Sequence, residues 1–273
     1  MDTVWYFAYG SNLTAETFLE HRGIRPLQAV PVRIPGWTLT FDIYGVPYQE
    51  PAFSSISPMS DAIVGPGAPS VHGTAYLVDR ADYSSIIASE GGGTAYKEVV
   101  LRAQVITTDR GAGTRSIEGE EDEEEERWLS VMSLTRAYAP IIPRCPSQRY
   151  KDIICNGAQE AHLPSDYQAF LAALPVYQSR QTAWRMIGAG IFLAIWIPFM
   201  TVAEWLTNAT SRVDRDGYCP RWVQTAVRFI LWAMWLHHDL VHARVFGRGD
   251  GLDQNSDEEK ILEKGGRGPI HLP

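Results

Sequence analysis

A turn near the start of the chain could bind a negatively charged group. Residues 4–7 form an apolar run that is typical of a strand, and the run breaks at Ala8-Tyr9-Gly10-Ser11-Asn12-Leu13. The glycine allows positive φ and close approach of a ligand, while the short polar residues after it can cap a following helix. The backbone N–H groups freed at this turn would suit a carboxylate, or a carbonyl oxygen that gains charge during a reaction.

A single carboxylate, Glu90, is the candidate for proton transfer. It follows the apolar run 86–88 and precedes three glycines, Gly91 to Gly93, so we expect it at the edge of a turn. Each feature alone is common without catalysis, because strand–turn–helix caps are widespread and a glutamate before glycines is usually solvated. Together, an anion site and an acid/base group would make a minimal active site.

A second cluster, at His237, His238, Asp239 and His242, could hold a metal ion, because positions 238 and 242 share one face of a helix. The sequence offers no further ligand at suitable spacing, and histidines near a helix end also favour the helix dipole. The sequence has no Gly-x-Ser-x-Gly elbow, Walker loop or dinucleotide-binding glycine pattern. We therefore expect neither a metal nor a cofactor.

The net charge of −8 comes from one segment. The acidic run 118–126 holds eight of the 32 acidic residues, and the other 24 balance the 24 basic ones. We interpret this run as a disordered, self-repelling insertion, with a docking site for a basic partner as the alternative. With no overall excess of basic residues, we expect no nucleic-acid partner.

The cysteines and the N-terminus indicate an intracellular, cytoplasmic protein. Cys145, Cys155 and Cys219 show no Cys-x-x-Cys spacing, which favours reduced thiols over a disulfide framework or a zinc site. The first residues are not basic, and the apolar run after them is too short for a secretory signal.

Apolar patterns predict an α+β domain. Strands are expected at 4–9, 37–44, 72–78 and 97–106, and helices at 150–160 and 165–174. Between them, residues 45–71 are rich in glycine and proline, and we predict an extended loop beside the site. At 273 residues the chain can hold a domain of about 170 residues and an appendage.

The composition changes beyond Pro175. Residues 186–203 carry no charge, a second apolar segment spans 222–245, and six of the nine tryptophans lie between 184 and 235. We predict a tryptophan-rich helical extension over 179–246 and a flexible tail over 247–273. Three arrangements of the extension stay open: a hairpin packed on the domain, one lying in a membrane surface, or one spanning the membrane.

Three blocks of the sequence resemble the gamma-glutamyl cyclotransferase family. The run 6–13 is similar to the family's substrate loop, and Glu90-Gly91 with Tyr96 and Val99-Val100 to its catalytic-glutamate segment. Residues 146–158, continuing through 163–167 to Leu171, resemble its C-terminal core block. The resemblance covers about residues 4–174 and implies a mixed β-barrel with flanking helices for a catalytic domain over 1–178.

The resemblance also implies a reaction. In this family the α-amine of a γ-glutamyl group attacks its own side-chain carbonyl, and 5-oxoproline and the attached amine are released. Glu90 would carry the proton from the ammonium to the leaving amine, without metal or cofactor. The substrate would be a small γ-glutamyl molecule, and the residues expected to bind it are Tyr6, Phe7, Ala8, Tyr9, Gly10, Ser11, Asn12 and Tyr150.

The extension and the long loop are most similar to the fungal members of gliotoxin-type pathways, which make sulfur-containing diketopiperazine (epipolythiodioxopiperazine) toxins. That similarity implies removal of a γ-glutamyl group from a glutathione adduct. The alternative is a non-catalytic binding or scaffold protein on the same fold. Because residues 181–273 contain none of the three blocks, we expect a chain without them to keep activity on a small peptide. The oligomeric state stays open.

Overall fold

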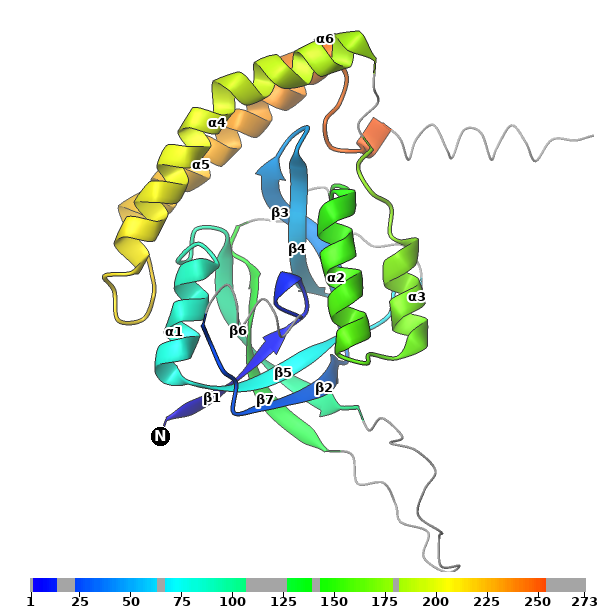
Figure 1. The fold of residues 1–273 in the computed structure, drawn as a ribbon, viewed down its shortest axis with the longest axis vertical. Helices are drawn as coiled ribbons and strands as arrows, with labels where there is room; N and C mark the ends of the chain where they lie inside the picture. The colour runs from blue at the N-terminus through cyan, green and yellow to red at the C-terminus, as the bar shows by residue number, and fades with distance from the viewer. Residues whose placement is uncertain are drawn as a thin grey trace, which may run out of the picture.

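A closed β-barrel forms the centre of the computed structural model, which describes residues 2–13, 23–62, 67–106, 127–138, 143–178 and 182–253 (Figure 1). Its strands lie in the order β1-β5-β2-β6-β7. Their bounds are β1 (Thr3–Ala8), β2 (Gln28–Ile34), β5 (Val71–Asp79), β6 (Tyr96–Val105) and β7 (Trp128–Arg136). All neighbours are antiparallel except β1 and β7, whose parallel contact closes the barrel.

A separate two-stranded sheet pairs β3 (Trp37–Val46) with β4 (Glu50–Pro58). Strand β4 corrects the prediction of an extended loop over 45–71. Its prolines, Pro51 and Pro58, stand near its two ends, and buried Ser54, Ser55 and Ser57 replace the expected apolar residues. A strand that buries hydroxyls lacks the apolar alternation by which a strand is recognised in sequence.

Three helices cover the barrel. Helix α1 (Arg80–Ser89) buries Ile86 and Ile87 on one side, whereas α2 (Gln148–Glu160) and α3 (Ser165–Ala173) cover the other. Helix α2 begins at Ser147, whose side-chain oxygen accepts the N–H of Tyr150 at 3.0 Å, a typical N-cap. Both helices predicted near the end of the domain are therefore present, close to their predicted bounds.

The C-terminal extension is a helical hairpin (Figure 1). Helices α4 (Ala183–Ser211) and α5 (Arg221–His237) lie side by side, and a π-helical turn η3 (His238–His242) leads into α6 (Ala243–Phe246). The hairpin packs on the β3–β4 sheet, where the indole N–H of Trp235 donates to the Gly45 carbonyl at 3.0 Å. Among the described residues, α4 is the one helix long and apolar enough to cross a membrane by length and composition.

Residues 247–253 correct the prediction of a flexible tail over 247–273. Asp250 is fully buried, and the carbonyl of Gly249 accepts the N–H of Tyr48 at 2.8 Å. Arg248 and Arg144 both contact the Asp250 carboxylate, so charge pairing as well as hydrogen bonding fixes the segment. The remaining predicted tail, 254–273, and the acidic run 118–126 lie outside the described residues.

Candidate active site

A small cavity opens where β1 ends. Its volume is about 30 Å³. Its walls come from six regions of the chain: β1 with the turn after it, β4, the turn after α1, the start of β6, β7, and the start of α2. The lining residues are Tyr6, Tyr9, Gly10, Ser11, Asn12, Ser54, Glu90, Tyr96, Leu134 and Tyr150.

Glu90 faces the turn after β1 across this cavity. It is the C-cap residue of α1, and its carboxylate accepts a hydrogen bond from the Asn12 amide, Nδ2 to Oε1, at 2.9 Å. The same amide nitrogen lies 2.9 Å from the hydroxyl of Tyr6. The fold thus brings together two sites that the sequence separates by 78 positions.

Position 10 requires glycine because neighbouring side chains leave no room for a Cβ, and not because of its backbone angles. Its φ is not among the positive ones, which corrects the expectation of positive φ at this turn. A Cβ at Gly10 would instead clash with the Ser54 hydroxyl and lie 3.4 Å from the Tyr150 hydroxyl. Ser11 and Asn12 begin the short 3₁₀ helix η1 (Ser11–Leu13), so their N–H groups have no acceptor within that helix.

Tyrosine hydroxyls line the opposite wall. The Tyr150 hydroxyl lies 2.9 Å from the Ser54 hydroxyl, and that of Tyr96 donates to the Ser54 carbonyl at 2.9 Å. Burial raises the pKa of Tyr150 to about 12 and also raises the pKa values of Tyr9 and Tyr96. These phenols are therefore neutral near pH 7, and among the described lining residues Glu90 alone carries a carboxylate.

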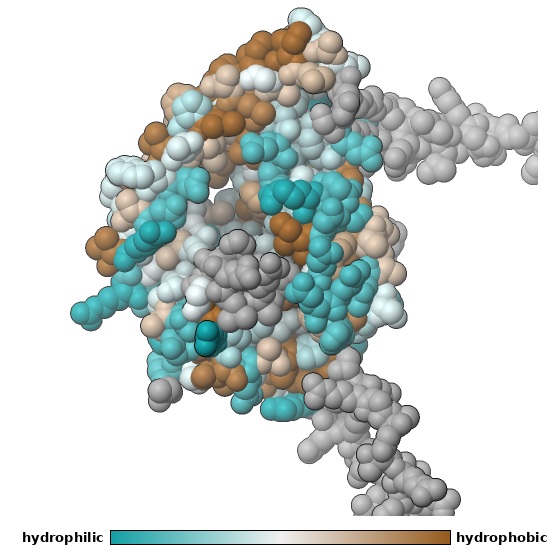
Figure 2. Space-filling model, viewed as in Figure 1, coloured by the Kyte–Doolittle hydropathy of each residue, from teal (hydrophilic) through white to brown (hydrophobic). Residues whose placement is uncertain are grey.

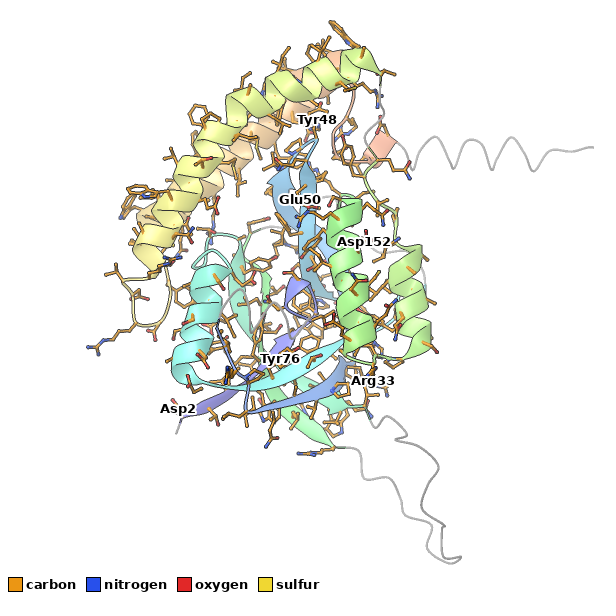
Figure 3. All side chains as sticks on the ribbon, in the orientation of Figure 1. Asp2, Arg33, Tyr48, Glu50, Tyr76 and Asp152 are labelled. Atoms are coloured by element: carbon orange, nitrogen blue, oxygen red, sulfur yellow. The ribbon has the colours of Figure 1, made fainter. Side chains whose placement is uncertain are left out.

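Glu50 holds the Tyr150 wall in place. Its buried carboxylate accepts the N–H of Ser147 at 3.1 Å and the hydroxyl of Ser147 at 2.8 Å, and Arg149 donates to it at 2.8 Å. These contacts tie the start of β4 to the first turn of α2, as Figure 3 shows for the labelled Glu50. Tyr150 is thereby held beside Ser54.

Two of the predicted substrate residues do not line the cavity. The side chain of Phe7 is fully buried in the barrel core, and Ala8 packs in the cluster beneath α1. Strand alternation explains Phe7, which points to the opposite side from Tyr6. Ala8 lies on the same side as Tyr6 and in the same cluster, without lining the cavity. Sequence reasoning missed Ser54 and Leu134, which carry no motif, and did not place Tyr96 among the substrate-binding residues.

The histidine cluster near the C-terminus acquires a third candidate ligand in the fold. Ligand atoms of His238, Asp239 and Asp250 lie within 4.8 Å of one another. Arg144 and Arg248 already contact both carboxylates, with Arg248 Nη2 at 2.9 Å from Asp239. The positive charge that a metal would supply is therefore provided by arginines, and we interpret the cluster as an ion-pair network.

Comparison with known proteins gives consistent matches. A family model described as "AclK C-terminal domain" matches residues 182–245. The gamma-glutamyl cyclotransferase aclK of Aspergillus oryzae is 41% identical over 261 residues, which cover 91% of this chain and 90% of that protein. The gamma-glutamyl cyclotransferase gliK of Aspergillus fumigatus is 33% identical over 95% of this chain and 94% of its own.

A third relative and a solved structure carry the same name. The gamma-glutamyl cyclotransferase gliK of Claviceps purpurea is 33% identical and matches over 88% of this chain and all of its own length. A solved structure titled gamma-glutamyl cyclotransferase aligns over 66% of this chain and 92% of its own, at 23% identity and a TM-score of 0.47. On the identity of the fungal relatives across nearly the whole chain, this protein belongs to the gamma-glutamyl cyclotransferases, a family of lyases.

Proposed function

We propose that this chain releases 5-oxoproline from the γ-glutamyl group of a glutathione-derived adduct. The α-amine attacks the side-chain carbonyl carbon, a five-membered ring closes, and the bond to the departing nitrogen breaks. The attacking ammonium must lose a proton and the leaving nitrogen must gain one. Because nucleophile and electrophile belong to one molecule, holding the γ-glutamyl group folded supplies much of the acceleration.

Glu90 is proposed to move the proton. Its carboxylate takes a proton from the ammonium and returns it to the leaving amine, so one group serves both steps. The Asn12 amide, 2.9 Å from the carboxylate, would fix its direction. The N–H groups of the 9–12 turn and the Tyr150 hydroxyl are proposed to hold the substrate's α-carboxylate and the developing oxyanion.

The observation that carries this proposal is that Glu90, the one carboxylate among the described lining residues, faces that turn in one small cavity. We propose a pathway to sulfur-containing diketopiperazine toxins of the gliotoxin type, because the relatives resemble this chain through the C-terminal extension as well as the barrel.

Replacing Glu90 by glutamine tests the proposal. Glu90→Gln keeps size and hydrogen bonding but cannot accept a proton, so kcat should fall about a hundredfold or more with little change in KM. Mass spectrometry of 5-oxoproline released from γ-glutamyl peptides and glutathione conjugates measures it. Glu160→Gln, the same change at an exposed position on α2, is the control and should keep full activity.

Two results would contradict the proposal. Full turnover by Glu90→Gln would place the base elsewhere. Absence of 5-oxoproline from the unaltered protein, across a panel of peptides and adducts, would favour the scaffold role instead.

We also propose that the hairpin lies on an intracellular membrane surface. Helix α4 buries a narrow stripe and exposes apolar residues around most of its circumference, which a lipid environment covers more completely than one protein partner. Figure 2 shows apolar residues along the outer edge of the hairpin. Four tryptophans on it are largely exposed: Trp184, Trp205, Trp222 and Trp232.

Contacts at both ends of the hairpin favour a flat orientation. Arg185 pairs with Asp253 at 3.2 Å near one end, and Cys219 donates its N–H to Gly92 at 2.9 Å near the other. Crossing a membrane would break these contacts. Exposed arginines stand at the two ends, where they could reach lipid phosphates: Arg212, Arg215 and Arg221 at the turn, and Arg244 opposite.

Liposome flotation tests this orientation. The protein should float with vesicles of phosphatidylcholine and phosphatidylserine, and less with phosphatidylcholine alone. The double variant Phe199→Glu/Trp205→Glu, changed at exposed positions of α4, should not float with the vesicles but should keep its activity on a small peptide. If the unaltered protein also stays at the bottom and runs as a dimer in light scattering, the face is a protein interface.

A further inference from the structure

The glycine turn that carries Glu90 is held from two sides. Gly91, Gly92 and Gly93 have φ values of +86°, +52° and +84°, a left-handed series that other residues adopt with strain. On the inner side, the N–H of Gly92 donates to Ile87 at 3.0 Å and that of Gly91 to Ala88 at 3.3 Å. Helix α1 thus satisfies N–H groups of the turn.

The carbonyl groups of the turn are satisfied by the hairpin. Cys219 donates its N–H to the Gly92 carbonyl at 2.9 Å. The guanidinium of Arg228, on α5, donates from Nη2 to Gly93 at 2.8 Å and from Nε to Thr94 at 2.7 Å. A planar guanidinium that binds two successive carbonyls fixes direction as well as distance, which a flexible ammonium does not.

The turn and the hairpin are also in close contact. A Cβ at Gly92 would lie 2.6 Å from the Cys219 sulfur, and one at Gly93 would lie 2.9 Å from the ring of Tyr218. Tyr218 also lines a small hollow together with Glu90 and Tyr96. The hairpin therefore leaves the turn little room to move.

We infer that the C-terminal hairpin is the positioning element for Glu90, and that Arg228 is its central residue. Three consecutive glycines have more backbone freedom than any other tripeptide, so a turn built from them needs outside contacts to hold one conformation. Arg228 is not among the residues that line the cavity, and it acts through its hydrogen bonds to the carbonyls of Gly93 and Thr94. The inference rests on the proposed role of Glu90.

Substitutions at Arg228 separate positioning from general stability. Arg228→Ala should lower kcat on a small γ-glutamyl peptide about tenfold or more, with KM changed less than about threefold, because orientation of the base is lost and binding is not. Arg228→Lys keeps the positive charge but lacks the planar guanidinium that binds both carbonyls, so its kcat should lie between those of Arg228→Ala and the unaltered protein. Arg221→Ala, an exposed arginine on the same helix, is the control and should match the unaltered protein.

Hydrogen exchange measures the turn directly, whatever the activity. Amides in residues 86–96 should exchange faster in Arg228→Ala than in the unaltered protein, and at the unaltered rate in Arg221→Ala. The measurement is made at a temperature where circular dichroism shows that both variants are folded. Unchanged exchange and unchanged kcat in Arg228→Ala would overturn the inference. If the unaltered protein releases no 5-oxoproline but amide exchange in residues 86–96 is faster in Arg228→Ala, the proposed function is wrong. The inference that Arg228 holds the glycine turn in place is then still supported.

Discussion

The two walls of the cavity are supported in different ways. The wall at Gly10, Ser54 and Tyr150 is held by contacts within the barrel domain, where Glu50 binds the N-terminus of α2. The wall that carries Glu90 is a glycine turn whose carbonyls are bound by the hairpin. The binding wall is thus self-supporting, whereas the proposed catalytic wall depends on a segment more than a hundred residues further along the chain.

This difference changes what we expect of the C-terminal extension. From the sequence, the extension was predicted to be dispensable for a small substrate, since it contains none of the family blocks. In the structure it contacts the turn next to Glu90 and covers Tyr44, Val46 and Tyr48 of the β3–β4 sheet. We therefore expect the extension to support catalysis in addition to any binding to a membrane surface.

Deletion of residues 181–273 should have the largest effect. It removes every hairpin contact to the glycine turn and exposes the apolar cluster on β3, so activity should be lost on small and bulky substrates alike. Release of 5-oxoproline from a small peptide and from a bulky conjugate measures it. Deletion of 254–273 alone is the control. A soluble truncated chain that turns over the small peptide normally would restore the sequence-based expectation.

Gly10→Val tests the cavity wall formed by Gly10, Ser54 and Tyr150. The added side chain would occupy the space beside Ser54 and Tyr150, so kcat/KM should fall about a hundredfold through blocked binding. The comparison is with Gly190→Val, at a glycine of α4 whose Cβ would meet nothing within 4 Å. A folded Gly10→Val protein with normal kinetics would show that substrate does not enter this cavity.

Tyr150→Phe should have an intermediate effect. It removes the hydroxyl that accepts the Ser54 N–H at 3.3 Å, and leaving that buried donor unsatisfied should cost about 1–3 kcal/mol of stability. Activity should fall roughly tenfold, mainly in kcat, if the hydroxyl also donates to the developing oxyanion. Urea unfolding and steady-state kinetics measure the two effects. A stability loss with unchanged kcat would make Tyr150 a wall residue only.

Acidification should loosen the hairpin by a small amount. Burial lowers the pKa values of His242 and His237, and the polar groups facing His242 are the Gly188 carbonyl, His237 and His238. Because the unfolded histidine takes up its proton near pH 6.5, the unfolded state binds more protons below that pH, and stability falls as pH decreases. Tm should drop a few degrees more between pH 7.5 and 5.5 than in His242→Gln. Equal drops would remove His242 as the cause.

Local patterns in the sequence predicted the parts of the fold that depend on neighbouring residues. Helices α2 and α3 follow from the helical spacing predicted at 150–160 and 165–174, and four of the strands from apolar runs. Strand β4 was not predicted, because its serines bury hydroxyls that form hydrogen bonds with distant groups. The Ser55 hydroxyl, for example, accepts the N–H of Arg136. Such a strand is recognisable only when its partners are known.

The sequence by itself determined the family resemblance, the candidate residues at 9–12 and at Glu90, and an apolar C-terminal extension. Only the tertiary structure decided why position 10 must be glycine, where Phe7 points, and that Arg228 binds the turn beside Glu90. Local conformation depends on residues a few positions apart, which a sequence pattern records. The contact between Arg228 and Gly93 joins residues 135 positions apart, and no local pattern encodes it, because it forms only when the hairpin packs on the barrel domain.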